Sequence, residues 1–132
     1  MKKIRFLAAA ALAVCLALAL GGCGASLPDG MQEDEVKKAA EATVSQLAGE
    51  DYEGLVASMD EVMKASTTLE DWQAVWQPIA AQVGAFEKIE SHALASKDGY
   101  AVDVVKVKYA NAALTFTLSY NADYQLSGLY VK

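Results

Sequence analysis

The sequence is poor in the side chains that most often carry chemistry. Its 132 residues include two cysteines, one histidine (His92) and one arginine (Arg5). A metal site needs several His, Cys or carboxylate ligands at characteristic spacings, and no such spacing occurs here. The G-x-S-x-G motif and a glycine-rich phosphate loop are also absent. We therefore expect no metal and no cofactor, and the sequence points to no catalytic residue.

Positive charge is scarce as well. Three of the 11 Lys and Arg residues lie within the first five positions and none of the 17 acidic residues precedes Asp29, so residues 23–132 carry a formal net charge of −9. This balance argues against a nucleic-acid partner, because counterion release requires clustered Lys and Arg. Residues 23–132 contain no arginine, the side chain that most often binds carboxylate and phosphate groups through two hydrogen bonds. The acidity is most simply explained as keeping an exported domain soluble.

The N-terminus has the pattern of an export signal. Lys2, Lys3 and Arg5 precede an unbroken apolar run from position 6 to position 20. A membrane-spanning helix needs about 20 apolar residues, whereas the core of a signal peptide needs about 7–15. The segment Leu20-Gly21-Gly22-Cys23 then resembles the bacterial lipobox, in which lipid is attached to the cysteine thiol and the chain is cut just before it. The alternative is an ordinary signal peptide with an incidental cysteine, but the order of charge, apolar run, small residues and cysteine favours a lipoprotein.

The lipobox resemblance implies a division of the chain into three parts. Residues 1–22 are a signal peptide that is removed, and Cys15 is removed with it. Residues 23–30 are the lipidated Cys23 and a flexible tether, which reaches roughly 25 Å when fully extended. Residues 31–132 form a single domain. We therefore expect the protein to be bound to the membrane through lipid on Cys23, at the extracytoplasmic face of a bacterial cell membrane, with no free thiol in the mature chain.

Helical periodicity dominates the first half of the domain. The first predicted helix is capped by Asp29, has a stripe formed by Val36, Ala40, Val44 and Leu47, and ends at Gly49. The second, short helix begins at residue 51. A turn at residues 63–68 is expected to lead to the third.

The third predicted helix has the clearest beginning in the sequence. Residues 67–70 read Thr-Thr-Leu-Glu, a capping box that begins a helix ending at Gly84. Pro78 lies inside this helix and predicts a kink near Trp76. Trp72 and Trp76 share a broad apolar face with their neighbours. They belong either to the core or to a ligand pocket, and such a stripe more often belongs to the core.

Beyond Gly84 the apolar period changes from helical to alternating. Four strands are predicted, over residues 85–95, 100–109, 113–121 and 124–131. The pair Val104-Val105 interrupts the alternation of the second strand, which indicates a bulge or burial on both faces. Short connections demand antiparallel pairing, and about three amphipathic helices need one face of the sheet to cover. The predicted fold is α+β, with three helices packed on one face of a curved, cone-like, four-stranded antiparallel sheet.

Several short motifs in this order resemble the bacterial family called Domain of Unknown Function 3887. They are Asp51-Tyr52, Leu69 with Trp72, Gly84 with Phe86 and Ile89, and Gly128-Leu129. The resemblance covers roughly residues 46–132, and the proline inside the third helix departs from the family pattern. It implies an architecture similar to the nuclear-transport-factor-like cone, in which helices close a curved sheet around a cavity. The family contributes no catalytic residue to this sequence.

Asp103 and His92 are the candidates for acid–base chemistry. If Asp103 faces inward, it is a buried carboxylate with a raised pKa, and Tyr100, Tyr109 or Tyr120 is its hydrogen-bond donor. If it faces outward, it lies beside lysines of its own strand, and this second orientation is favoured. His92 is expected on a solvated polar face, because alternation places it with Lys88 and Glu90.

Three classes of function remain open. The first is a non-catalytic module that binds a small apolar ligand or a protein, with Trp72, Trp76, Asp103 and Tyr120 as speculative lining residues. The second is a small-molecule enzyme of the isomerase or dehydratase type that uses the cone cavity. The third is a structural domain that forms a homodimer. Because no convincing acid–base set is found, we expect a protein that is not an enzyme.

The lipid anchor leads to a direct prediction. Replacing Cys23 by Ser removes the thiol that would accept lipid, so the variant is expected to remain uncleaved or unlipidated. Metabolic labelling with a fatty-acid analogue measures this, and label retained by Cys23→Ser would contradict the assignment.

Overall fold

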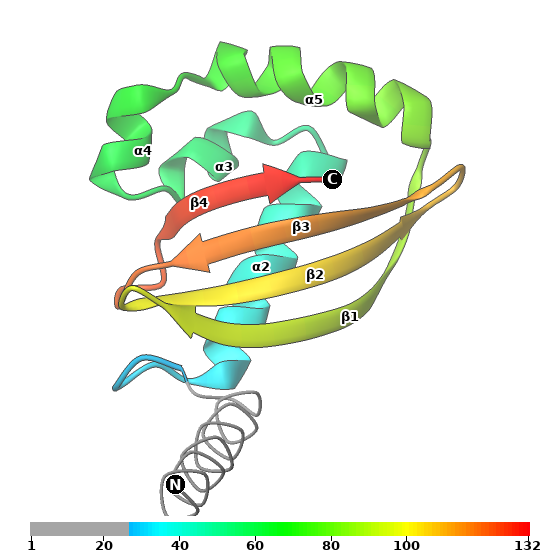
Figure 1. Cartoon of the computed structure of the whole chain (residues 1–132). Helices are drawn as coiled ribbons and strands as arrows, with labels where there is room; N and C mark the ends of the chain where they lie inside the picture. Colours follow the sequence, from blue (N-terminus) through cyan, green and yellow to red (C-terminus); the bar gives the residue numbers. More distant parts are fainter. Residues whose placement is uncertain (1–26) are drawn as a thin grey trace, which may run out of the picture.

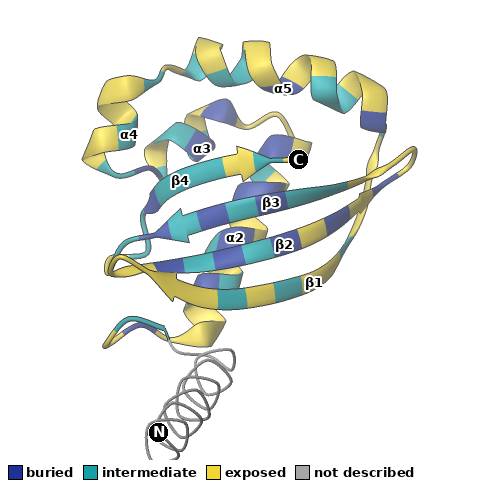
Figure 2. Cartoon of the chain, viewed as in Figure 1, coloured by how far each residue is buried: buried dark blue, intermediate teal, exposed yellow. Residues whose placement is uncertain are grey.

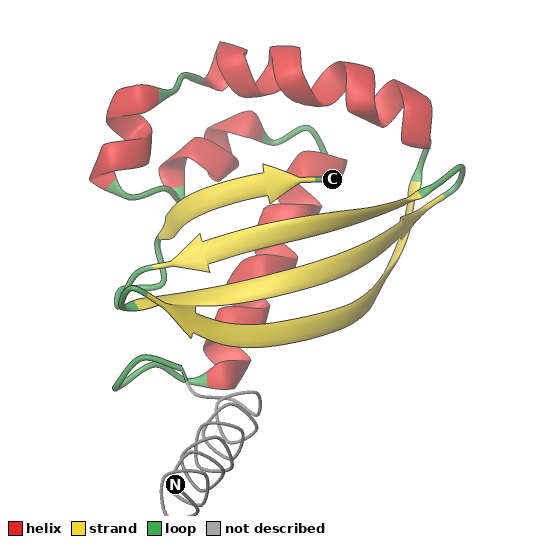
Figure 3. Cartoon of the chain, in the orientation of Figure 1, coloured by secondary structure: helices red, strands yellow, loops and turns green. Residues whose placement is uncertain are grey.

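The computed structural model describes residues 27–132, so the expected signal peptide, Cys23 and the first part of the tether lie outside the described residues. Four helices come first along the described chain: α2 (Glu33–Ala48), α3 (Tyr52–Ala57), α4 (Glu61–Ser66) and α5 (Leu69–Val83). Four strands follow: β1 (Phe86–Lys97), β2 (Tyr100–Tyr109), β3 (Ala113–Tyr120) and β4 (Leu126–Val131). The strands form one antiparallel sheet in the order β1-β2-β3-β4 (Figures 1 and 3). The α+β prediction is confirmed, and the sheet is curved but not closed.

Helix α2 crosses one face of the sheet. Its predicted stripe is buried, with Val36, Ala40 and Val44 at 0 % exposure and Leu47 at 1 %, and Gly49 caps its C-terminus. The predicted N-cap at Asp29 is wrong. The cap is Gln32, whose side chain makes no capping bond, and its backbone N–H donates instead to the Tyr124 hydroxyl at 2.8 Å. A hydrogen bond from Gln32 to Tyr124, which is distant in the sequence, therefore takes the place of a local side-chain cap at the start of α2.

The segment between α2 and α5 contains one more helix than expected. Asp51 caps α3 by accepting a hydrogen bond from the backbone N–H of Gly54. Asp60 caps α4 in the same way, by accepting from Met63 at 2.9 Å. The predicted turn at residues 63–68 is thus partly helical, because Asp60 starts a helix that buries none of its residues. The described residues therefore contain four helices, and three were expected.

Helix α5 starts one residue later than predicted. Thr68, not Thr67, is the N-cap, and it exchanges two hydrogen bonds with Asp71 in a capping box. The helix continues through Pro78 to Val83, and Gly84 ends it with a φ of 80°. Only Trp76 and Val83 are buried. The rest of the predicted apolar face therefore remains partly or fully accessible, as Figure 2 shows along α5.

The alternation of β2 is uninterrupted. Asp103, Val105 and Val107 are buried, while Val104 lies half-buried on the opposite face. Of the two alternatives predicted for Val104-Val105, the bulge is therefore wrong, whereas burial on both faces is met in part, since Val105 is buried and Val104 half-buried. Strand β1 is irregular instead, with register shifts between Phe86 and Lys88 and between Ile89 and Ser91.

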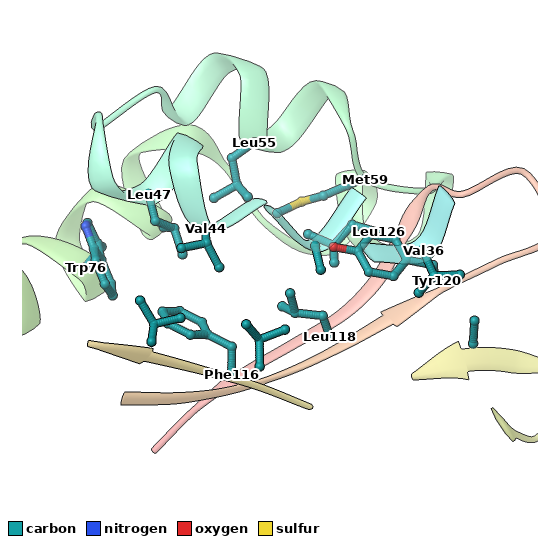
Figure 4. Close-up of a cluster of buried hydrophobic side chains, with 14 of the residues drawn as sticks. Val36, Val44, Leu47, Leu55, Met59, Trp76, Phe116, Leu118, Tyr120 and Leu126 are labelled. Atoms are coloured by element: carbon teal, nitrogen blue, oxygen red, sulfur yellow. The ribbon is translucent and has the colours of Figure 1, made fainter. Parts of the chain in front are cut away.

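The core lies between α2 and α3 on one side and the inner face of the sheet on the other (Figure 4). Trp76 of α5 reaches into it, with its ring 6.1 Å from the rings of both Tyr109 and Phe116. Among the described residues, the buried apolar side chains run from Met31 to Leu126 and belong to one cluster. Because this cluster joins the helices to the sheet, we expect residues 27–132 to fold on their own. Among these residues, no helix is long and apolar enough to cross a bilayer.

The burial of Trp76 leads to a prediction. Trp76→Ala removes a side chain that is 3 % exposed, and the cavity should lower the free energy of unfolding by about 3–5 kcal/mol. Val62 of α4 is 74 % exposed, so the control Val62→Ala should change it by less than about 0.5 kcal/mol. Urea denaturation followed by circular dichroism measures both. Equal stability of the two variants would contradict the placement of Trp76.

Candidate functional site

A bulge in β1 determines where His92 points. Ile89 lies opposite Val107 and Ser91 lies opposite Lys106, so Glu90 is an extra residue without a partner on β2. The extra residue reverses the alternation, and His92 lies opposite Val105, whose side chain is fully buried. The prediction of a solvated His92 is therefore wrong, because its side chain is only 15 % exposed.

Asp103 faces the interior next to this histidine. Its exposure is 0 %, so the favoured outward orientation is wrong and the inward alternative is correct. The inward alternative predicted a tyrosine as the hydrogen-bond partner of Asp103, and this part is wrong. The partner is His92, whose Nδ1 lies 2.6 Å from Asp103 Oδ2. Among the described residues, Asp103 Oδ1 has no hydrogen-bond partner. Burial raises the pKa of the Asp103 carboxyl, while the hydrogen bond and the charge of His92 act in the opposite direction.

Helix α2 contributes charged groups beside this pair. His92 Nε2 lies 3.7 Å from a carboxylate oxygen of Glu41, whose side chain is 53 % exposed. Lys37 is close enough for its charge to lower the pKa of Asp103 slightly, after the larger effects of burial and His92. Asp103 therefore fixes the orientation of the imidazole, and Nε2 is the ring atom nearest to solvent-accessible groups.

Tyr120 lies in the core close to the same helix. Its hydroxyl is 2.8 Å from the Thr43 hydroxyl, which in turn donates to the carbonyl of Ala39 at 3.1 Å. Burial raises the pKa of Tyr120 far above its usual value near 10. The pair connects α2 to β3 through a buried hydrogen bond, so Tyr120 positions the helix on the sheet.

An apolar cleft lies between α5 and β4. Its volume is about 200 Å³. Trp72, Val75, Trp76 and Ile79 line it from α5, and Leu129, Tyr130 and Val131 line it from β4, with Leu47 contributing from α2. Val75 and Tyr130 are 56 % and 70 % exposed, so the cleft opens to solvent.

The cleft and the polar pair are different places in the fold. Trp72 and Trp76 both line the cleft, whereas Asp103 and Tyr120 lie under α2 and do not. Within residues 27–132, no three His, Cys, Asp or Glu side chains are grouped as a metal site would require. Alternation alone could not identify the His92–Asp103 pair, since the bulge at Glu90 brings it together.

The polar pair predicts a loss of stability on truncation. His92→Ala leaves the buried Asp103 without its partner, and the free energy of unfolding at pH 7 should fall by about 3–5 kcal/mol. The control Glu41→Ala removes an exposed carboxylate and should cost less than about 1 kcal/mol. Chemical denaturation measures both, and equal small losses would show that the pair contributes little.

The loss of stability caused by His92→Ala should depend on pH in a defined direction. Without His92, burial alone holds the pKa of Asp103 above 3.8, its ordinary value in the unfolded chain. Between these two values the folded state binds more protons than the unfolded state, so stability falls as the pH rises. The loss caused by His92→Ala should therefore be smaller at pH 4 than at pH 7. An equal loss of stability at pH 4 and at pH 7 would contradict this account.

Comparisons with known proteins identify the family of the chain. No curated protein matches it. A solved structure, described as "NMR structure of protein from Ruminococcus gnavus ATCC 29149", is similar with a TM-score of 0.66 and 23 % identity, covering 79 % of this chain and 94 % of that chain. At this identity the likeness shows the fold. The family "Protein of unknown function (DUF3887)" matches residues 40–129, and this match ends at Leu129, the last residue of the motif Gly128-Leu129. The chain belongs to the DUF3887 family.

Proposed function

We propose that this protein is a lipid-anchored, non-catalytic binding module on the extracytoplasmic face of a bacterial membrane. In this proposal, the lipid on Cys23 holds the domain close to the bilayer. The cleft between α5 and β4 receives an apolar group of a small ligand or of a protein partner. The cleft is the observation on which the binding part of the proposal rests.

The anchor is supported by the order of features at the N-terminus. The basic beginning, the apolar run and Leu20-Gly21-Gly22-Cys23 follow one another as in exported lipoproteins. The chain offers a matched control for Cys23→Ser, because Cys15 lies inside the segment expected to be removed. Cys15→Ser should keep its fatty-acid label, so the two variants separate loss of one particular thiol from a general effect on export.

The composition of the cleft supports an apolar ligand group. All of its lining residues are aliphatic or aromatic, and none carries a formal charge. An apolar cavity of about 150 Å³ holds benzene, so a cleft of about 200 Å³ is suited to a single aromatic ring or a branched aliphatic group. Burial of such a group is favourable by roughly 25 cal/mol per Å² of apolar surface.

Binding without catalysis fits the arrangement of the polar groups. The His92–Asp103 pair is the most chemically suggestive feature of the described residues, but neither residue lines the cleft. Its contacts run from β1 to β2 and to Glu41 of α2, which is the arrangement of a structural link. We therefore assign the pair to stability and the cleft to binding.

Toluene is a suitable probe of the cleft because it is neutral and has one ring. The chain contains two tryptophans, and both line the cleft, so their two indole N–H signals in an NMR spectrum of residues 27–132 report directly on occupancy. Toluene should shift both signals. Val75→Lys places a charge at the rim and should weaken binding by at least about tenfold, while Val62→Lys, the same change on exposed α4, should leave it unchanged.

The proposal fails if toluene shifts neither indole signal up to its solubility limit. It also fails if Val62→Lys weakens binding as much as Val75→Lys does, because the effect would then come from charge and not from the cleft.

A further inference from the structure

The two edges of the sheet are protected to different degrees. The edge formed by β1 has two register shifts, and Glu87, Lys88 and Glu90 lie beside them. Bulges and charges of this kind prevent the edge of a sheet from pairing with another strand. Strand β4, at the opposite edge, reads LSGLYV and carries no charged residue and no proline. The chemistry of β4 therefore leaves this edge open to pairing.

The register shows which backbone groups of β4 are free. Thr115 and Lys132 exchange both of their backbone hydrogen bonds, at 3.0 and 2.9 Å. Hydrogen-bonded and non-hydrogen-bonded pairs alternate along an antiparallel ladder, so the N–H and C=O groups of Val131 and Leu129 point away from β3. Within residues 27–132, neither residue makes a backbone hydrogen bond outside the sheet.

The same edge is already used once for pairing within the chain. The backbone N–H of Leu126 donates to the carbonyl of Ser58 at 2.8 Å, and the carbonyl of Leu126 accepts from the N–H of Asp60 at 2.9 Å. Together these bonds make a parallel bridge between Leu126 and Met59. The segment after α3 therefore pairs with the first outward-facing position of β4 and leaves the later ones, Leu129 and Val131, unpaired.

The free backbone groups border the apolar cleft, because Leu129 and Val131 line it together with the side chains of α5. We infer that the partner is an extended peptide segment, which adds to β4 as a fifth strand and places one apolar side chain in the cleft. This inference rests on the proposed function and specifies its ligand. Backbone hydrogen bonds to Leu129 and Val131 supply affinity for many sequences, and the cleft selects the side chain.

A second copy of the chain is a poorer occupant of this edge. Each copy carries a formal net charge of −9 over residues 23–132, so two copies repel one another, whereas a peptide flanked by lysines is attracted. The probe is accordingly a dye-labelled nonapeptide, KTVTFTVTK, whose phenylalanine matches the size of the cleft. Its binding to the full chain in phosphatidylcholine nanodiscs is measured by fluorescence anisotropy, with empty nanodiscs as the blank.

Two comparisons isolate the contribution of the backbone. The first uses the same peptide N-methylated at its five central amides, which keeps the side chains but removes the donors, and it should bind at least about tenfold more weakly. The second uses Val131→Pro, which removes the outward-pointing N–H, is tolerated at a sheet edge, and also replaces a side chain that lines the cleft. Val131→Ala also shortens this side chain but keeps the N–H, so Val131→Pro should weaken binding by about tenfold more than Val131→Ala does.

Each outcome decides the inference. Strand addition is supported if the unmodified peptide binds tightly, the N-methylated peptide binds weakly, and Val131→Pro weakens binding of the unmodified peptide about tenfold more than Val131→Ala does. Equal binding of both peptides overturns it and leaves an apolar cleft without backbone pairing. Binding of neither peptide also overturns it, and the toluene titration then shows independently whether the cleft binds at all. A dimer in sedimentation experiments that Val131→Pro converts to a monomer would assign the edge to a second copy instead, and would overturn the peptide inference.

Discussion

The packing of α2 against the inner face of the sheet is the contact on which the rest of the structure depends. The apolar stripe of α2 meets the alternate residues of β2 and β3 that face inward, and Figure 4 shows Val44 and Leu47 opposite Phe116. Thr43 and Glu41 extend the same helix face with polar contacts to Tyr120 and His92. Because one helix supplies both kinds of contact, its position on the sheet fixes the core and the polar pair together. Helix α5 reaches this core mainly through Trp76.

Much of this arrangement can be predicted from the sequence, because it follows from periodicity. The stripe of α2, the start of the short helix α3 and the bounds of β2 and β3 are local patterns, and each lies within one residue of where the sequence predicts it. The start of α5 differs by one residue because the sequence allows two adjacent capping boxes, Thr67 with Glu70 and Thr68 with Asp71, and the structure forms the second. Helix α4 is missed because its six residues form no apolar stripe and bury nothing.

The polar pair is missed for a different reason. Alternation places His92 on the outer face only if β1 is regular, and a single extra residue at Glu90 reverses that strand. Asp103 is misplaced for another reason: it shares a face of β2 with Val105 and Val107, so unbroken alternation of that strand puts it inside, away from the lysines. A bulge of this kind has no signature in composition, because what stabilises it is the fit between two strands. The cleft could be predicted in part, since Trp72 and Trp76 are recognisable as an apolar pair. That β4 would line its other side depends on the tertiary fold. The pair and the cleft lie toward opposite edges of the sheet, so substitutions in one should be additive with substitutions in the other.

The shallow burial of α5 has a consequence for how the molecule fluctuates. This helix contributes two buried residues out of 15, whereas α2 contributes five out of 16. Detaching α5 therefore exposes far less apolar surface than detaching α2, and local opening of the former requires only a fraction of the global unfolding free energy. Backbone amides of α5 should exchange their hydrogens with solvent through such partial openings, while those of α2 should wait for the whole domain to unfold. The layer of α2 and the sheet should therefore be the most stable part of the domain, and α5, which is held to it mainly by Trp76 and Val83, should be the part that opens first.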